Sequence, residues 1–387
     1  MSRATKGASM RLAACLLGLC VAAAVDNQRR VSARAQRVVY IGTYTGEMSK
    51  GIYAFRFDDS SGALTPLGLV AETPSPSFLT SSTNGRFVFA VNEVQSFGGA
   101  ASGSVTSFAV DPSTAKLTEI GVQPSRGAGP CHLVLDRTGR YLAVANYGGG
   151  NYALLPVGAD GRLQPATSVV AGEGSETPQS KPLGHAVGFD AGNRFLVTAD
   201  KGLNRMLVYR FDATTGALTP NQPSSTALPP GAGPRHFEFH PNRRWLFTIS
   251  EQAATITTFS WNETTGSLTA SGSVPTRPEG FTTGSTAEIA VHTSGRFVYG
   301  SNRGHDSIAV FRVGADGALA LVEHEATRGQ TPRNFALDPT GRWLIAANQR
   351  SHTLAVFAID QATGALTPVG PLSSVGSPVS ILFMDVR

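Results

Sequence analysis

The chain has 387 residues, of which 41% are hydrophobic, and it carries a formal net charge of +5 with a pI near 9.3. This hydrophobic content is ample for a sizeable core. Its 32 Lys and Arg residues are scattered and form no long basic run, which argues against a nucleic-acid partner, whereas the basic balance suits a small anionic substrate.

The start of the chain resembles an export signal. A positively charged segment is followed by an apolar, uncharged run at residues 12–25, and Ala22–Ala24 offer a cleavage site of the A-x-A type. The run is short for a membrane span, and no second one follows. We expect residues 1–35 to be a signal peptide with a short leader, and residues 36–387 to be a mature domain that is periplasmic or secreted and has no membrane partner.

The mature region has the composition of an all-β protein that is held together by packing alone. The chain contains 43 Gly and 23 Pro, and its apolar runs are short, rich in aromatic and β-branched residues, and bounded by turn residues. No long window shows a sustained apolar period of 3.6 residues. Only Cys131 remains after the signal, so no intramolecular disulfide can form.

Two motifs alternate along this region. The first is a turn followed by a short strand, with Gly at the turn in six of seven copies and spacings of 46 to 55 residues. Its copies lie at residues 61–66, 114–118, 160–163, 215–220, 265–269, 316–319 and 363–368. A period of this length indicates a repeat architecture in which each unit is one four-stranded blade.

The second motif is a hairpin whose return strand ends in a small or polar residue. Six complete copies have return strands at Phe87–Asn92, Tyr141–Asn146, Phe195–Asp200, Trp245–Ser250, Phe297–Asn302 and Trp343–Asn348. The seventh copy is divided between the chain ends, with residues 377–383 as its first strand and residues 38–43 as its second. Pairing of these ends closes a ring and leaves no open sheet edge, so we predict a seven-bladed β-propeller rather than an open solenoid.

In a propeller, the start of each inner strand and the end of the next strand meet at the same rim of the central channel. The strand starts here are Ser77, His132, His185, Arg235, His236, Glu288, Arg333 and Asn334. The strand ends are Asn92, Glu93, Asn146, Tyr147, Asp200, Lys201, Ser250, Glu251, Asn302, Arg303, Asn348 and Gln349. Cationic groups dominate, and such a rim suits a substrate with carboxylate, phosphate or many hydroxyl groups.

Some of these residues also have a purely structural interpretation. Asn at a strand end commonly caps backbone groups, and a single buried His often serves only as a hydrogen-bonding partner. The convergence of Arg, Glu and His on one rim is harder to explain in this way. The sequence has no G-x-S-x-G or H-E-x-x-H motif, no closely spaced set of zinc ligands and no cofactor motif, so we expect neither a metal nor a cofactor.

Four segments resemble one known family. They are residues 40–45, residues 231–241 with 249–251, residues 289–299 with 302–303, and residues 330–338 with 344–352. The chain resembles the bacterial propeller 6-phosphogluconolactonases across residues 38–385. The resemblance implies a lactonase of carbohydrate metabolism whose partner is a small anionic or polyhydroxylated lactone. We expect it to act as a monomer.

The same family includes a fungal 3-carboxy-cis,cis-muconate lactonizing enzyme, whose site uses a His, two Arg and a Glu. By motif position these residues correspond to His185, Arg235, Arg303 and Glu251. We hypothesise that Glu251 or His185 is the general base for attack of water on the lactone, while the two arginines hold the substrate's anionic group and stabilise the oxyanion. The further candidates for substrate binding are His132, His236, Arg333 and Asn302.

Three functions remain open. Lactone hydrolysis is favoured, because a carboxylate between two arginines gives no advantage to a module that only binds anions. The alternatives are a non-catalytic propeller that binds an anion or a partner, and a muconate-type lactonizing enzyme that uses the same residues in the closing direction. The family's phosphorylated substrate belongs to a cytoplasmic pathway, whereas this chain carries an export signal. An unphosphorylated sugar lactone therefore fits this chain better.

Overall fold

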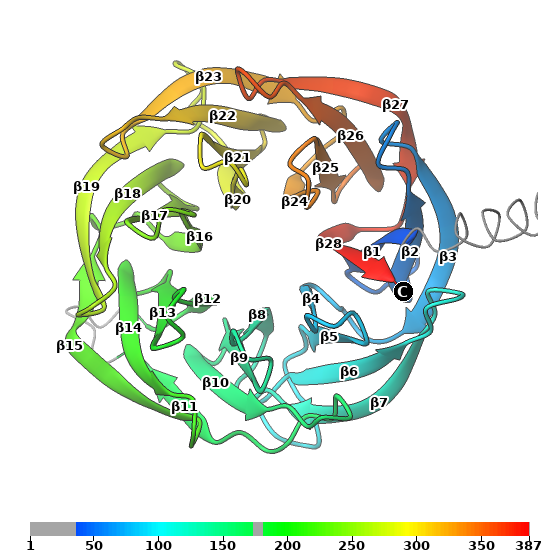
Figure 1. Cartoon of the computed structure of the whole chain (residues 1–387), viewed down its shortest axis with the longest axis vertical. Helices are drawn as coiled ribbons and strands as arrows, with labels where there is room; N and C mark the ends of the chain where they lie inside the picture. Colours follow the sequence, from blue (N-terminus) through cyan, green and yellow to red (C-terminus); the bar gives the residue numbers. More distant parts are fainter. Residues whose placement is uncertain (1–35, 173–180, 387) are drawn as a thin grey trace, which may run out of the picture. The chain divides into compact units, whose positions relative to one another are not determined.

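A computed structural model describes residues 36–172 and 181–386, and the predicted signal segment lies outside them. Residues Arg37–Val386 form one compact unit. Its regular elements are all β-strands, and they form seven four-stranded antiparallel sheets that surround a central channel (Figure 1). The predicted all-β, seven-bladed propeller is therefore confirmed. No helix within the described ranges is long and apolar enough to cross a membrane.

One blade uses both ends of the chain. From the channel outward it consists of β28 (Pro378–Val386), β1 (Gln36–Thr43), β2 (Gly51–Phe57) and β3 (Leu64–Glu72). Pairing of the two ends was predicted from the divided seventh repeat and is confirmed. The amide of Ile381 donates to Asn334 Oδ1 at 2.9 Å, and Ser380 Oγ accepts from the amide of Leu79 at 3.1 Å. The closing strand is thus joined to the blades on both of its sides.

The other six blades follow chain order from the channel outward. The first three are β4 (Leu79–Ser81), β5 (Phe87–Asn92), β6 (Ser104–Val110) and β7 (Leu117–Pro124); β8 (Pro130–Leu135), β9 (Tyr141–Asn146), β10 (Asn151–Pro156) and β11 (Ser168–Ala171); and β12 (Gly184–Phe189), β13 (Phe195–Asp200), β14 (Arg205–Asp212) and β15 (Ala217–Ala227). The last three are β16 (Pro234–Phe239), β17 (Trp245–Ser250), β18 (Thr255–Asn262) and β19 (Ser267–Pro275); β20 (Ser285–Val291), β21 (Phe297–Arg303), β22 (Ser307–Val313) and β23 (Leu319–Ala326); and β24 (Pro332–Leu337), β25 (Trp343–Asn348), β26 (Thr353–Ile359) and β27 (Leu366–Ser374).

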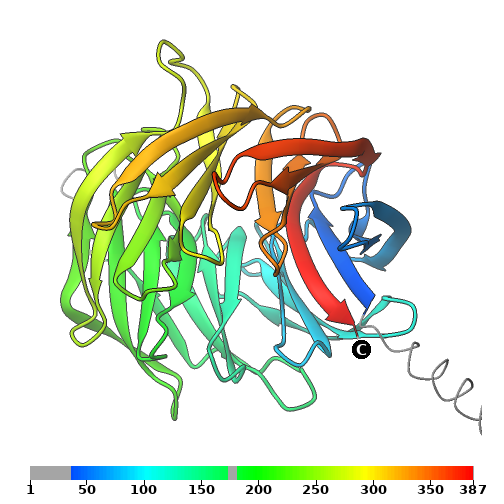
Figure 2. The same ribbon diagram turned by 45° about the horizontal axis from the view of Figure 1, so that its top comes forward.

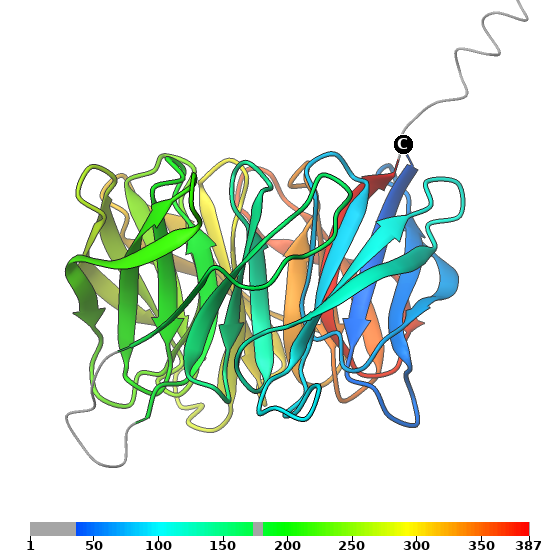
Figure 3. The ribbon, with the colours of Figure 1, turned by 90° about the horizontal axis from the view of Figure 1, so that it is seen from below.

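The hydrophobic core lies between neighbouring blades. Strands β5, β9, β13 and β17 are buried along their whole length, because the two faces of each blade pack against the adjacent blades. This explains why the second strands read as continuous apolar runs rather than alternating ones. The strands run between two rims of loops, and the twist of each blade is visible in the side and tilted views (Figures 2 and 3).

A buried aspartate organises the turn between the first two strands of several blades. Asp136 is 2% exposed, and its Oδ1 accepts hydrogen bonds from the amides of Arg140 at 2.7 Å and Tyr141 at 2.9 Å. Its Oδ2 accepts from the Thr138 hydroxyl at 2.6 Å and the Asn193 amide group at 2.9 Å. Burial opposes ionisation, but these hydrogen bonds together lower the pKa of Asp136.

We expect Asp136→Ala to lower the free energy of unfolding by about 2–4 kcal/mol, because the buried amide of Tyr141 and the part-buried amide of Arg140 would lose their acceptor. Urea unfolding at pH 7 measures this change, with Asp160→Ala as the control because Asp160 caps an exposed turn. Since the pKa is lowered on folding, the stabilisation is present above the unfolded pKa and is lost as the pH falls through the folded pKa. Equal midpoints for both variants would contradict this role.

Candidate active site

The start of each inner strand and the end of its partner lie side by side, as the sequence predicted. Pro234 pairs with Ser250, Gly184 pairs with Asp200, and Pro332 pairs with Asn348. The residues that follow these pairs therefore gather at one rim of the channel. We call this rim, with the side chains described below, the cationic mouth.

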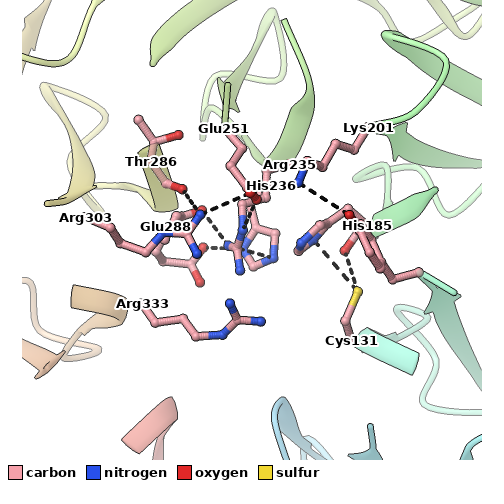
Figure 4. Close-up of polar contacts among 12 residues, drawn as sticks. Cys131, His185, Lys201, Arg235, His236, Glu251, Thr286, Glu288, Arg303 and Arg333 are labelled. Carbon is pink, nitrogen blue, oxygen red and sulfur yellow. Dashed lines mark hydrogen bonds and ion pairs between the residues drawn. The ribbon is translucent and has the colours of Figure 1, made fainter. Parts of the chain in front are cut away.

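A β-bulge lets consecutive residues of one strand serve the same site. In β16 the register shifts between Pro234 and His236, so that Arg235 is the extra residue. Regular alternation would send Arg235 and His236 to opposite faces of the blade. Both side chains instead point toward the channel (Figure 4), and each residue is 3% exposed. Inner strands β8, β12, β20 and β24 carry a register shift at the same place.

Glu251 is the centre of the cationic mouth (Figure 4). Its carboxylate forms ion pairs with Lys201 Nζ at 2.7 Å, Arg235 Nε at 3.2 Å and Arg303 Nη2 at 3.3 Å. Burial raises the pKa of Glu251, but the three cations more than offset it and bring the pKa to about 2. Burial and the nearby Arg235 lower the pKa of Arg303 to about 10, so it remains a cation at neutral pH.

Arg333 faces the same space without a carboxylate partner. Its Nη2 donates to the Tyr44 hydroxyl at 2.6 Å, and its guanidinium lies over the Tyr44 ring at 5.2 Å. Tyr44 in turn donates to Glu93 Oε2 at 2.8 Å. Among the residues that the structure describes, no Asp or Glu lies within ion-pair distance of Arg333. It is therefore the cation best placed to meet an anionic group of a ligand.

His185 lies beside this cluster and is held neutral. Its ring contacts those of Tyr147 and His236, with centroids 5.5 Å and 5.1 Å away, and its Nδ1 is 3.8 Å from Cys131 Sγ. Burial and then the charge of Arg235 lower the pKa of His185 well below its usual value. A neutral imidazole in this position can accept a proton from a bound water.

A second polar layer lies deeper in the channel. His236 Nδ1 is 2.7 Å from Glu288 Oε1, and the Asn334 amide group donates to Glu288 Oε2 at 2.5 Å. Burial raises the pKa of Glu288 to about 7, against the lowering effect of Arg235. His236 has a pKa well below its usual value because of burial and of Arg235. Its ring is also 5.0 Å from that of His132.

The structure thus brings together most, but not all, of the predicted site residues. Glu251, His185, Arg235, Arg303 and Arg333 meet at the mouth, while His236 and His132 lie in the deeper layer. Asn302 does not join them. It is fully buried, and its Nδ2 donates to the carbonyl of Thr276 at 2.8 Å, which is the capping role expected of an Asn at a strand end.

The sequence did not single out Lys201, Tyr44 or Glu288 as site residues. Lys201 occupies the same strand-end position in its blade as Glu251 does in the next blade, and Glu288 aligns with His236. These alignments could have identified Lys201 and Glu288 as site residues from the sequence. Across residues 36–172 and 181–386, no group of three His, Cys, Asp or Glu side chains is arranged to hold a metal ion.

Comparison with known proteins gives consistent matches. Residues 38–383 match the family described as "Lactonase, 7-bladed beta-propeller". The chain is 35% identical over 349 residues to a 6-phosphogluconolactonase of Bacillus subtilis, covering 89% of this chain and 97% of the relative. It is 30% identical to a 6-phosphogluconolactonase of Formosa agariphila, covering 85% and 94%. The solved structure of a periplasmic gluconolactonase from Pseudomonas aeruginosa is 33% identical, with a TM-score of 0.83 and coverage of 91% of this chain and 100% of that chain.

We expect Glu251→Gln to lower the free energy of unfolding by about 2–4 kcal/mol, because it leaves three buried cations without their shared carboxylate. Urea unfolding in low and high salt measures the change, and salt should restore part of it by screening the cations. Because folding lowers the pKa of Glu251 from 4.5 to about 2, its stabilisation is present above pH 4.5 and is lost as the pH falls toward 2. A variant as stable as the wild type in low salt would show that the ion pairs contribute nothing.

Proposed function

Because the chain belongs to the seven-bladed β-propeller lactonases, we propose that it hydrolyses the cyclic ester of sugar-acid lactones. The observation that carries the proposal is the cationic mouth, where one carboxylate fixes three cations and Arg333 remains available beside a neutral His185. The names of the Bacillus and Formosa relatives support lactone hydrolysis, and that of the Pseudomonas structure supports an unphosphorylated substrate.

The cations have two tasks in this proposal. Attack of water on a lactone carbonyl places negative charge on the carbonyl oxygen, and fixed guanidinium groups stabilise that charge most strongly where water is excluded. Arg235 and Arg303 perform this task because Glu251 holds them in place. Arg333 binds hydroxyl or anionic groups on the remainder of the substrate, since its guanidinium has N–H groups beyond the one used by Tyr44.

His185 moves the proton. It accepts a proton from water as the water oxygen bonds to the carbonyl carbon, and it returns that proton to the ring oxygen as the ester C–O bond breaks. The low pKa of His185 suits the second step, because the imidazolium beside Arg235 and Arg333 is a strong acid. Glu251 serves as an electrostatic anchor instead, since both of its carboxylate oxygens are already engaged by Lys201, Arg235 and Arg303.

We further propose that the protein works outside the cytoplasm. The export pattern of residues 1–35 supports this location, as does the periplasmic gluconolactonase among the structural relatives. A phosphorylated sugar lactone is scarce there, which favours gluconolactone or a similar unphosphorylated compound. The mouth has four cations against two carboxylates, so its charge alone admits either substrate.

The chemistry can be tested by proton release from purified mature protein with gluconolactone and with 6-phosphogluconolactone, corrected for spontaneous hydrolysis. We expect His185→Gln to lower kcat by about 100-fold or more with little change in KM, because it removes the proton acceptor. Arg333→Lys should mainly raise KM, because a lysine cannot keep the planar contact with Tyr44.

His324→Gln is the matched control, because His324 lies on the outermost strand β23 and bonds the carbonyl of Thr276. It should retain wild-type kinetics. If the wild-type protein accelerates neither lactone, sugar-lactone hydrolysis is wrong and a binding propeller becomes the better interpretation. If His185→Gln keeps its kcat, the proton is moved by another group.

The location can be tested by expressing the full chain in a Gram-negative host and separating the periplasmic fraction. We expect mature protein that lacks residues 1 to about 24 in that fraction, as read by N-terminal sequencing. Replacing Arg3, Lys6 and Arg11 by Glu should retain the uncleaved chain in the cytoplasm. Cytoplasmic, full-length wild-type protein would contradict the proposed export.

A further inference from the structure

Three rings from different blades contact one another within the channel. Phe78 of the first complete hairpin, His132 of β8 and His236 of β16 come from different blades and touch one another across the channel. The ring centroids are 4.2 Å apart for Phe78 and His132, 5.0 Å for the two histidines, and 5.7 Å for Phe78 and His236. These rings, which we call the plug, lie between Arg235 of the cationic mouth and the space beneath it.

Beneath the plug lies a cavity of about 600 Å³, a size typical of small-molecule sites. It extends to the loops that follow the inner strands, at Arg137, Thr293 and Pro339, and so faces the rim opposite the mouth. Much of its wall is aromatic, formed by Phe78, Phe189, Phe237, Phe239 and Phe335. We call this space the lower cavity.

Small side chains on the inner strands leave space for the lower cavity. At the layer of Glu238, the neighbouring inner strands contribute Gly188, Ala290 and Ala336. A Cβ at Gly188 would come within 2.8 Å of the Phe237 ring, so that the aromatic wall requires glycine there. The lower cavity is therefore built by the choice of residues on three blades rather than left over by poor packing.

Glu238 is a carboxylate in this aromatic space that has no cationic partner. Its Oε2 accepts one hydrogen bond, from the amide of Val291 at 2.6 Å, and no Lys or Arg in the described ranges lies within ion-pair distance. The Glu238 side chain is exposed within the cavity, and the nearest charged side chain on the wall is another carboxylate, Glu288. An exposed carboxylate that has no cationic partner in the protein is available to pair with a cation from solution.

The other charged or titratable groups on the wall are already engaged. Glu288 is bonded to His236 and Asn334, and Arg137 donates to the carbonyls of Phe189 at 3.1 Å and Asp190 at 3.3 Å. Asp338 accepts amide hydrogens of its own turn, and burial keeps His132 neutral by lowering its pKa. None of these groups supplies a counter-ion to Glu238.

We propose that the lower cavity is a second binding site, for a small organic monocation whose ammonium group pairs with Glu238 and whose apolar body packs against the phenylalanine rings. A carboxylate supplies the charge for an ammonium group, and aromatic faces attract cations as well as apolar surface. An anion would be repelled by Glu238 and Glu288, and a neutral apolar molecule would bury the carboxylate without a partner. The site is independent of the lactone chemistry at the mouth.

The test is calorimetric titration of the mature protein at pH 8 with 2-phenylethylammonium and with its neutral analogue 2-phenylethanol. The charged probe should bind at least about tenfold more tightly, since pairing with Glu238 is available only to it. Glu238→Gln should remove this preference by weakening the ammonium and not the alcohol.

Two further variants keep the result interpretable. Ala290→Leu fills the lower cavity without changing charge and should abolish binding of both probes, while circular dichroism and thermal unfolding report that each variant is folded. Glu119→Gln removes an exposed carboxylate on β7 and should leave both affinities unchanged. Equal binding of the two probes by the wild type, or ammonium binding that survives Glu238→Gln and Ala290→Leu, would overturn the proposal.

Discussion

The pairing of β28 with β1 is the constraint on which the rest of the molecule depends. Seven blades enclose a channel only if the last inner strand is fixed beside the first complete blade, and the contacts of Ser380 and Ile381 provide this on both sides. A closed ring has no sheet edge to protect, and it forces seven inner strands to converge on one axis. Side chains that lie far apart in sequence, such as Tyr44 and Arg333, therefore become neighbours.

Convergence on one axis also creates an electrostatic problem, because charges in a narrow channel interact strongly when little water separates them. The charged groups are arranged in layers along the channel. At the mouth, Lys201, Arg235 and Arg303 pair with Glu251, whereas Arg333 donates to Tyr44, which in turn donates to Glu93. Deeper in the channel, Glu288 is hydrogen-bonded to His236 and Asn334. Glu288 also lines the lower cavity, so the acidic space begins at this second layer. One channel can thus hold two spaces of opposite character without neutralising either.

The sequence predicted the fold well because the blade is a local unit. A hairpin period near 50 residues and the complementary chain ends suffice to count blades and to close the ring. Residues at strand starts and ends could be assigned to one rim, and among them the family resemblance pointed to Glu251, Arg235 and Arg303. The bulge at Arg235 could not be predicted, since a shift of register is set by packing within the blade rather than by the alternation of polar and apolar residues.

The same limit explains the residues that the sequence left unassigned. Glu238 stands between Phe237 and Phe239 in an inner strand, and only the small residues of neighbouring blades reveal that it faces a cavity. Asn302 illustrates the converse: its position in the sequence fits a site residue, but its side-chain amide donates a hydrogen bond to the Thr276 carbonyl. The role of Glu251 also follows from its surroundings rather than its type: three cations around one carboxylate make it an anchor for charge, which leaves the proton to a neutral group nearby. In this mouth that group is an imidazole whose protonated form is disfavoured by the same cations, so a proton taken from water is readily passed to the leaving oxygen.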